Sequence, residues 1–109
     1  MIVEIWINCP SEEVAVQLAR GLMDMRLVAS ANRYPKIASR YFWKGRAVEA
    51  EEVPLLLKTR KELFGRVAEA ARKLHPYETP SILCLDVAAA NRDYADWVFA
   101  ETVGADPAG

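Results

Sequence analysis

The side chains best suited to chemistry gather in one segment, His75-Pro76-Tyr77-Glu78-Thr79-Pro80. His75 is the only histidine of the 109 residues, and an imidazole can bind copper or zinc or exchange a proton near neutral pH. Because tight sites for these metals need three or four ligands, the alternative is that His75 caps the preceding helix and hydrogen-bonds across a subunit contact. We take His75 as a candidate metal ligand, and Tyr77 and Glu78 as candidate ligand-binding residues.

A second candidate site lies where an expected strand runs into a helix. Thr59-Arg60-Lys61-Glu62 has the spacing of a capping box, in which the Thr59 hydroxyl bonds an amide of the first turn and Glu62 reaches back. Free amides at such a helix start, together with Lys58, can hold an anion. The alternative is that Thr59 is only the N-cap and that Lys58 pairs with a carboxylate.

Acidic and sulfur-containing residues offer weaker candidates. Glu49, Glu51 and Glu52 could attract divalent cations through their oxygens, although such a run more often forms a solvated edge or pairs with opposite arginines. Cys9 and Cys84 lack the spacing of a metal site, and we expect free thiols. The sequence has no P-loop, GxGxxG or HExxH motif, and it predicts no catalytic residue.

Composition narrows the classes of function. Hydrophobic residues make up 52% of the chain, charged residues 27%, and the formal net charge is −1. This mixed surface argues against a nucleic-acid partner and against binding to an anionic membrane. No run of about 18 apolar residues is present, and residues 1–9 lack the basic region of a signal peptide. We therefore expect a cytoplasmic protein.

The elements that must position these residues follow from periodicity. The pattern predicts a strand over 2–8, a helix over 12–26, extended runs over 28–34 and 82–87, a helix over 60–73 and a short helix after Asn91. A long hairpin has arms at 37–43 and 47–58 around Lys44-Gly45, because glycine accepts the positive φ of such a turn. This βαββαβ order favours an α+β, ferredoxin-like sandwich with helices on one face of an antiparallel sheet. We expect one domain over 1–103 and a flexible tail over 104–109.

The hairpin is longer than one small domain can cover. A lone hairpin is unstable in water, so a sister copy of the chain should lie against it. Tyr41 and Trp43 alternate on one face of the arm, and aromatic residues on a protruding arm usually anchor an interface. We expect both residues at a contact between subunits.

Five stretches, taken together in this order, carry a family resemblance. They are Pro-Ser-Glu-Glu-Val-Ala at 10–15, Ser39-x-Tyr41-x-Trp43-x-Gly45, Glu52-Val53 leading to Lys58-Thr59, the segment 75–80, and Asp93-Tyr94-x-x-Trp97. The chain resembles the CutA family of divalent-cation tolerance proteins. The resemblance implies a ferredoxin-like fold with an extended hairpin and a C-terminal helix, assembled as a homotrimer like that of the PII signalling proteins. It also implies a response to metal ions, with copper bound by some members, and it brings no catalytic mechanism with it. We expect copper or another divalent metal to bind at clefts between subunits, and we expect no enzymatic activity because no catalytic constellation is found.

Some positions differ from the pattern of the resembled family. Ser30 and Ile7 stand where relatives can carry cysteine, and Leu74 stands where a second histidine is found. These differences argue against a copper site of that kind. Cys9 lies two residues beyond Ile7, some ~7 Å along a strand, and the sequence does not fix its position relative to His75.

Two other functions share this order of elements. One is a small enzyme on a ferredoxin-like scaffold, of the α+β-barrel oxygenase or isomerase type, with His75 as general base. It predicts a dimer and a pocket within each subunit. The other is an RNA-recognition module, but the aromatic residues here flank a turn and the net charge is negative.

Overall fold

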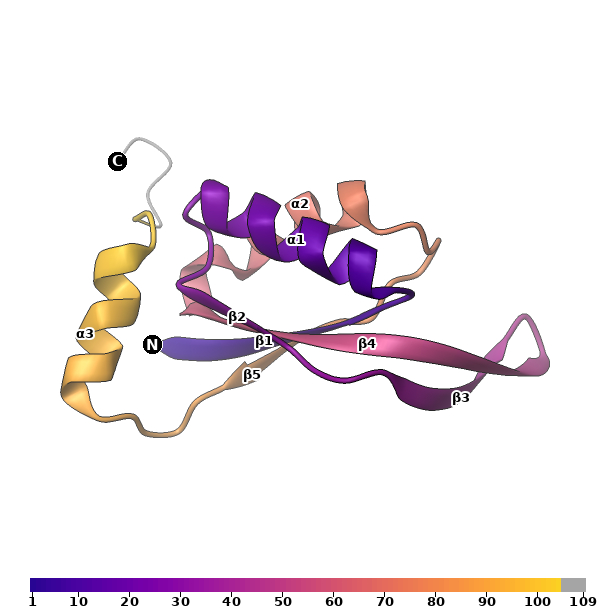
Figure 1. Ribbon diagram of the computed structural model, residues 1–109. Coiled ribbons are helices and arrows are strands. Elements are labelled where there is room, and N and C mark those ends of the chain that lie inside the picture. The colour runs from indigo at the N-terminus through magenta and orange to yellow at the C-terminus, as the bar shows by residue number, and fades with distance from the viewer. Residues whose placement is uncertain (105–109) are drawn as a thin grey trace.

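An antiparallel sheet with two helices packed on one face forms the body of the protein, as a computed structural model shows for residues 1–104 (Figure 1). The elements are β1 (Ile2–Cys9), α1 (Glu12–Asp24), β2 (Ser30–Arg33), β3 (Ile37–Trp43), β4 (Arg46–Arg60), a 3-10 turn (Lys61–Leu63), α2 (Phe64–Leu74), β5 (Ile82–Asp86) and α3 (Arg92–Glu101). The strand order is β2-β4-β1-β5, with β3 also paired to β4. The prediction of an α+β, ferredoxin-like sandwich is confirmed.

The core lies between the sheet and the layer of α1 and α2. Alternation along β1 turns Val3, Ile5 and Ile7 toward the helices. Apolar residues at helical spacing on α1 and α2 meet them and are fully buried: Leu18, Leu22, Val67 and Ala71. Ser11 begins α1 as predicted, since its hydroxyl accepts a hydrogen bond from the amide of Val14 at 3.2 Å.

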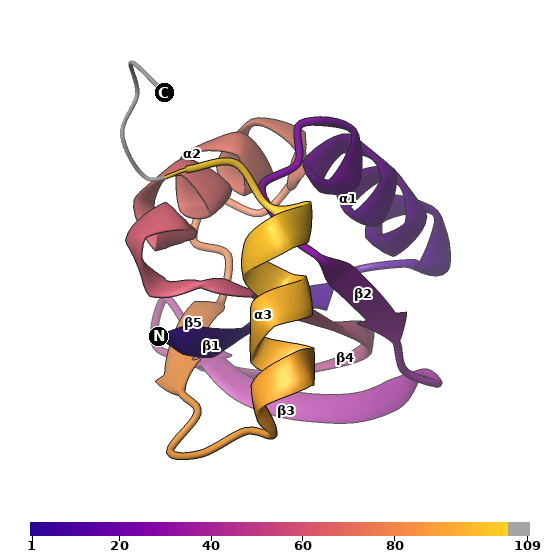
Figure 2. The same ribbon diagram turned by 90° about the vertical axis from the view of Figure 1, so that its left-hand side faces the viewer.

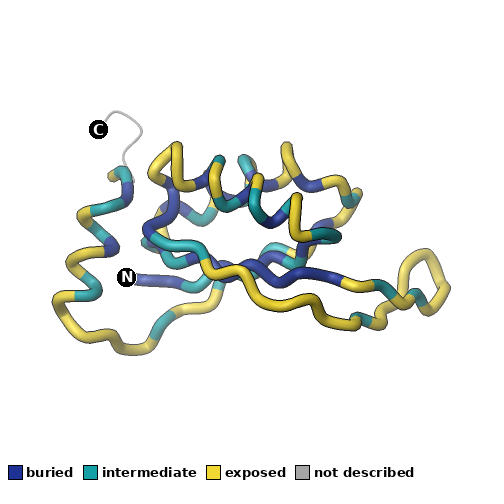
Figure 3. The backbone as a smooth tube through the Cα atoms, in the orientation of Figure 1, coloured by how far each residue is buried: buried dark blue, intermediate teal, exposed yellow. Residues whose placement is uncertain are grey.

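The hairpin of β3 and β4 extends past the helix layer (Figure 1). Its turn has positive φ at Lys44 (51°) and Gly45 (79°), a conformation that glycine adopts without strain. Burial divides the 15-residue strand β4 in two, since residues 46–51 are largely exposed and 52–57 are buried (Figure 3). The predicted long hairpin is confirmed, and half of it lies outside the cover of its own chain.

The predicted capping box at Thr59 is wrong. Strand β4 continues to Arg60, because Val3 and Ile2 of β1 pair with Thr59 and Arg60. The buried Thr59 hydroxyl donates to the carbonyl of Leu27 at 2.6 Å and not to a helix amide. Helix α2 follows only after the 3-10 turn, and no side-chain cap begins it. Pairing with a central strand has overridden a local helix signal.

Helix α3 lies across the end of the sheet, below α1 and α2 (Figure 2). Its Val98 is buried against Ile2 and Ala29. The guanidinium of Arg60 donates to the carbonyl of Phe99 at 2.5 Å and to Oγ1 of Thr102 at 3.0 Å. Arg60 thereby bonds carbonyls that a helix end leaves without partners.

Helix α3 is tied to the sheet by these contacts, and one domain over 1–103 stays a prediction. The predicted flexible tail falls, apart from Gly104, on residues 105–109, which lie outside the described residues. Among the described helices, none has both the length and the apolar character that crossing a membrane requires.

Candidate functional site

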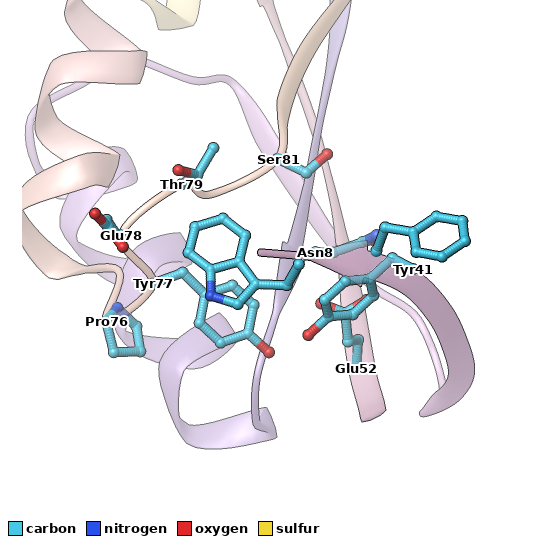
Figure 4. A pocket seen from close by; sticks show the side chains of 10 residues that line it. Asn8, Tyr41, Glu52, Pro76, Tyr77, Glu78, Thr79 and Ser81 are labelled. Carbon is cyan, nitrogen blue, oxygen red and sulfur yellow. The ribbon is translucent and has the colours of Figure 1, made fainter. Parts of the chain in front are cut away.

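A pocket of about 690 Å³ lies between the hairpin arm and the segment that follows α2 (Figure 4). Residues from four segments line it: Asn8 of β1, Tyr41 and Trp43 of β3, Glu52 of β4, and Tyr77 and Glu78 of the connection to β5. The pocket therefore joins two stretches that the sequence analysis treated separately, the aromatic arm and the histidine segment. Sequence reasoning named neither Asn8 nor the particular role of Glu52.

Both ring nitrogens of the buried His75 are already bonded. Its Nε2 lies 2.8 Å from the carbonyl oxygen of Asn8, and because a carbonyl only accepts, Nε2 carries the proton. Its Nδ1 accepts a hydrogen bond from the backbone amide of Tyr77 at 3.2 Å. The backbone amide of His75 also donates to Ala71 and closes α2. A metal ion or a substrate proton could reach this ring only by displacing one of these bonds.

His75 instead fixes the geometry of the pocket wall. Its ring contacts the ring of Tyr77 edge-on, with centroids 4.9 Å apart, and its bonds join β1 to the start of the connection toward β5. Tyr77 is held in the pocket, where burial and the negative charge of Glu52 raise the pKa of its phenol. The arrangement places a tyrosine hydroxyl beside a carboxylate.

Glu52 differs from the rest of its acidic run. Glu49 and Glu51 are exposed and pair with Arg40 and Lys36 across the hairpin, at 2.5 and 3.9 Å. Glu52 is only 6% exposed, and the interpretation of the run as a solvated edge is wrong for this residue. Glu52 lies on the same face of β4 as Val48 and Ala50, which occupy alternate positions before it and are half-buried. This alternation could have identified Glu52 as a buried residue.

The charge of Glu52 also acts on Cys9. Burial raises the pKa of the Cys9 thiol to about 11, and the negative charge of Glu52 contributes in the same direction. Both Cys9 and Cys84 are free thiols, as predicted. Burial raises the pKa of Cys84 as well, with a smaller contribution from Asp86. Neither thiol has the depressed pKa of a reactive nucleophile.

The aromatic arm residues face this pocket within their own chain. Tyr41 and Trp43 line it and remain 36% and 39% exposed, whereas Phe42 between them is 82% exposed. The Nζ of Lys44 lies 5.6 Å from the centre of the Trp43 ring and 3.9 Å from a Glu78 oxygen. The place of Tyr41 and Trp43 at a contact between subunits stays a prediction.

The structure does not bring Lys58 and Thr59 to this pocket. Lys58 pairs opposite Glu4 on β1, four residues from Asn8, a separation of about 13 Å along a strand. The Thr59 hydroxyl is occupied by the carbonyl of Leu27. The helix start expected directly beside both residues is absent, because β4 runs to Arg60, and ligand binding by Lys58 and Thr59 stays a prediction. Within residues 1–104, no three His, Cys, Asp or Glu side chains are grouped closely enough to hold a metal ion.

Comparison with known proteins gives one consistent result. The family model described as CutA1 divalent ion tolerance protein matches residues 3–101. The chain is 44% identical over 92 residues to the divalent-cation tolerance protein CutA of Thermus thermophilus, covering 84% of this chain and 89% of the relative. It is 39% identical over 93 residues to mouse protein CutA, of which it spans about half, 52%.

Solved structures agree with the sequence matches. The divalent cation tolerance protein of Thermus thermophilus superimposes with a TM-score of 0.91 at 41% identity, over 94% of this chain and all of that one. The periplasmic divalent cation tolerance protein CutA of Archaeoglobus fulgidus gives 0.90 at 31% identity, over 93% and 98%. Identities of this size across nearly the whole chain support common ancestry as well as a common fold.

Proposed function

This chain belongs to the family of CutA1 divalent ion tolerance proteins, and we propose on that basis that it takes part in the response of a cell to divalent metal ions. The observation that carries the proposal is the match over residues 3–101, joined to 44% identity with a divalent-cation tolerance protein. The test is complementation. Cells lacking their own relative should regain growth at raised copper when they express this chain, and growth equal to that of cells with an empty vector would refute it.

We further propose that the working unit is a homotrimer. The sheet face turned away from α1 and α2, here called the open face, carries Trp6, Leu83 and Leu85. Leu83 is 57% exposed and Leu85 is 46% exposed, and exposed apolar residues gathered on one face mark interaction surfaces. The free half of the hairpin needs cover of the same kind. Light scattering should give three times the mass of one chain.

Metal binding is proposed at clefts between subunits, with copper or another divalent ion as ligand. Residues 1–104 of one chain hold no group of three suitable side chains, so a tight site would have to combine ligands from different chains. Calorimetry with Cu(II) and Zn(II) on the wild type and on His75→Ala tests whether His75 takes part. Equal heats would exclude His75, and the two occupied ring nitrogens favour that outcome.

We propose a binding role and not a catalytic one. The enzyme alternative required His75 as general base, but its Nδ1 already accepts a hydrogen bond and its Nε2 donates one. No similarity reported above favours that alternative. A cytoplasmic location is also proposed, and cell fractionation with an antibody against the chain tests it.

A further inference from the structure

Glu52 is a buried carboxylate that faces the pocket without a charged partner. The residue is 6% exposed, and within residues 1–104 it forms no ion pair, unlike its neighbours Glu49 and Glu51. The hydroxyl of Tyr77 is the hydrogen-bond donor beside it. Its side chain lines the pocket, and this donor leaves the negative charge of the carboxylate in place. A carboxylate in this position is costly unless a cation or a donor meets it.

Aromatic rings form the walls around this carboxylate. The side chains of Tyr41 and Tyr77 point toward Glu52, with their hydroxyl ends close to it (Figure 4), and the ring of Trp43 also lines the pocket. Aromatic faces attract cations through the negative potential above the ring. Rings beside a buried carboxylate are the surroundings that proteins use to bind organic ammonium groups.

The chain already places one ammonium group against this pocket. The Nζ of Lys44 lies 5.6 Å from the Trp43 ring centre and 3.9 Å from an oxygen of Glu78, and Trp43 and Glu78 both line the pocket. Glu78 and Lys44 are largely exposed, so this contact is at the rim. Glu52, on the inner wall, remains without a cation.

The charged groups of the lining disfavour an anion and a tightly bound metal ion. Its charged side chains are both acidic, Glu52 and Glu78, which disfavours an anion. A metal ion would need more His, Cys, Asp or Glu side chains than residues 1–104 bring together. We propose that this pocket binds a small organic cation, whose ammonium group lies against the Glu52 carboxylate and whose carbon atoms contact the rings of Tyr41 and Tyr77. The inference is independent of the proposed role in metal tolerance, because no metal ion enters it.

The test is a titration of the ¹⁵N-labelled protein with n-butylammonium, followed by NMR, in a metal-free buffer. The chain has three tryptophans, Trp6, Trp43 and Trp97, and only Trp43 lines the pocket. The Trp43 indole N–H signal should shift and saturate, while those of Trp6 and Trp97 stay in place. Neutral 1-butanol has the same shape, and its affinity should be lower by a factor of about ten or more, since a bond to a charged group is lost.

Two matched variants locate the ammonium group. Glu52→Gln removes one charge from the inner wall without changing the side-chain shape, and it should reduce the affinity for n-butylammonium to that for 1-butanol. Glu51→Gln removes the same charge from the exposed neighbouring position and should bind as the wild type does. Equal affinities of the wild type for n-butylammonium and 1-butanol, or an unshifted Trp43 signal, would overturn the proposal without any variant. Equal losses in the two variants would also overturn it, by assigning the effect to net charge.

Discussion

The open face offers the sharpest test of the proposed assembly, through the substitution Leu83→Asp. Leu83 pairs opposite Trp6 on β1 and is 57% exposed in the single chain. Its neighbours Ile82 and Cys84 point to the opposite face, toward the helices. The change therefore places a carboxylate on the open face and leaves the core packing intact. We expect a folded chain that no longer assembles at micromolar concentration.

The size of the effect follows from the exposed fraction. Full burial of a leucine side chain is worth about 1.5–3 kcal/mol, so the exposed part of Leu83 can contribute roughly 1–1.5 kcal/mol per subunit. Three copies give roughly 3–5 kcal/mol in a trimer, and each 1.4 kcal/mol corresponds to a factor of about ten. Loss of the apolar contact alone should weaken assembly about a hundredfold or more. The cost of burying a new carboxylate adds to this.

Sedimentation equilibrium over a hundredfold range of concentration measures the association constant. Met23→Asp is the matched control, because Met23 is 44% exposed and lies on α1, in the helix layer on the other side of the sheet. Circular dichroism shows whether each variant is folded. A Leu83→Asp protein with the same mass as the wild type at every concentration would refute the assignment of the open face as an interface.

Three further substitutions test other contacts. Thr59→Val leaves the carbonyl of Leu27 buried without its donor, and urea unfolding should show a loss of about 1–3 kcal/mol in the free energy of unfolding. Thr59→Ser keeps the hydroxyl and should retain most of the wild-type stability. Equal stability of all three proteins would contradict the contact. The folded pKa of Cys9, about 11, lies above the ordinary thiol value of 9.0, so its contribution to stability is complete below about pH 9 and is lost as pH rises toward about 11, by up to about 1.4 kcal/mol per pH unit. Cys9→Ala should show a shallower decline in the free energy of unfolding over that range, and identical slopes would contradict the shift. Arg60→Met removes the donor to Phe99 and should cost about 1.5–3 kcal/mol with faster hydrogen exchange throughout α3. Unchanged exchange there would show that the hydrogen bonds of Arg60 do not hold α3.

Most of the fold could be predicted because its signals are local or periodic. The alternation of Val3, Ile5 and Ile7 marks a strand with a buried face, and Lys44-Gly45 marks the hairpin turn. Thr59 was misassigned because its capping pattern is also local, while the partner that keeps it in a strand, Val3, lies 56 positions away in the sequence. Spacing among neighbours carries no information about that pairing.

The site was predicted in part for the same reason. Tyr77 and Glu78 could be named from a short segment, and both line the pocket. The bonds that occupy His75 come from Asn8, far away in the sequence, and from a backbone amide. Glu51 is exposed and Glu52 is buried because only Glu52 packs against the body of the protein. The alternation along β4 already indicated this difference.

The central position of β1 has a consequence for synthesis of the protein. This strand leaves the ribosome before both of its partners, since it pairs on one side with residues 53–60 and on the other with residues 82–86. The strand therefore stays unpaired, with its apolar side chains uncovered, until most of these residues have been synthesised. Non-local pairing of this kind slows folding and leaves apolar segments open to aggregation. The nascent chain should accordingly be a client of ribosome-associated chaperones over most of its length.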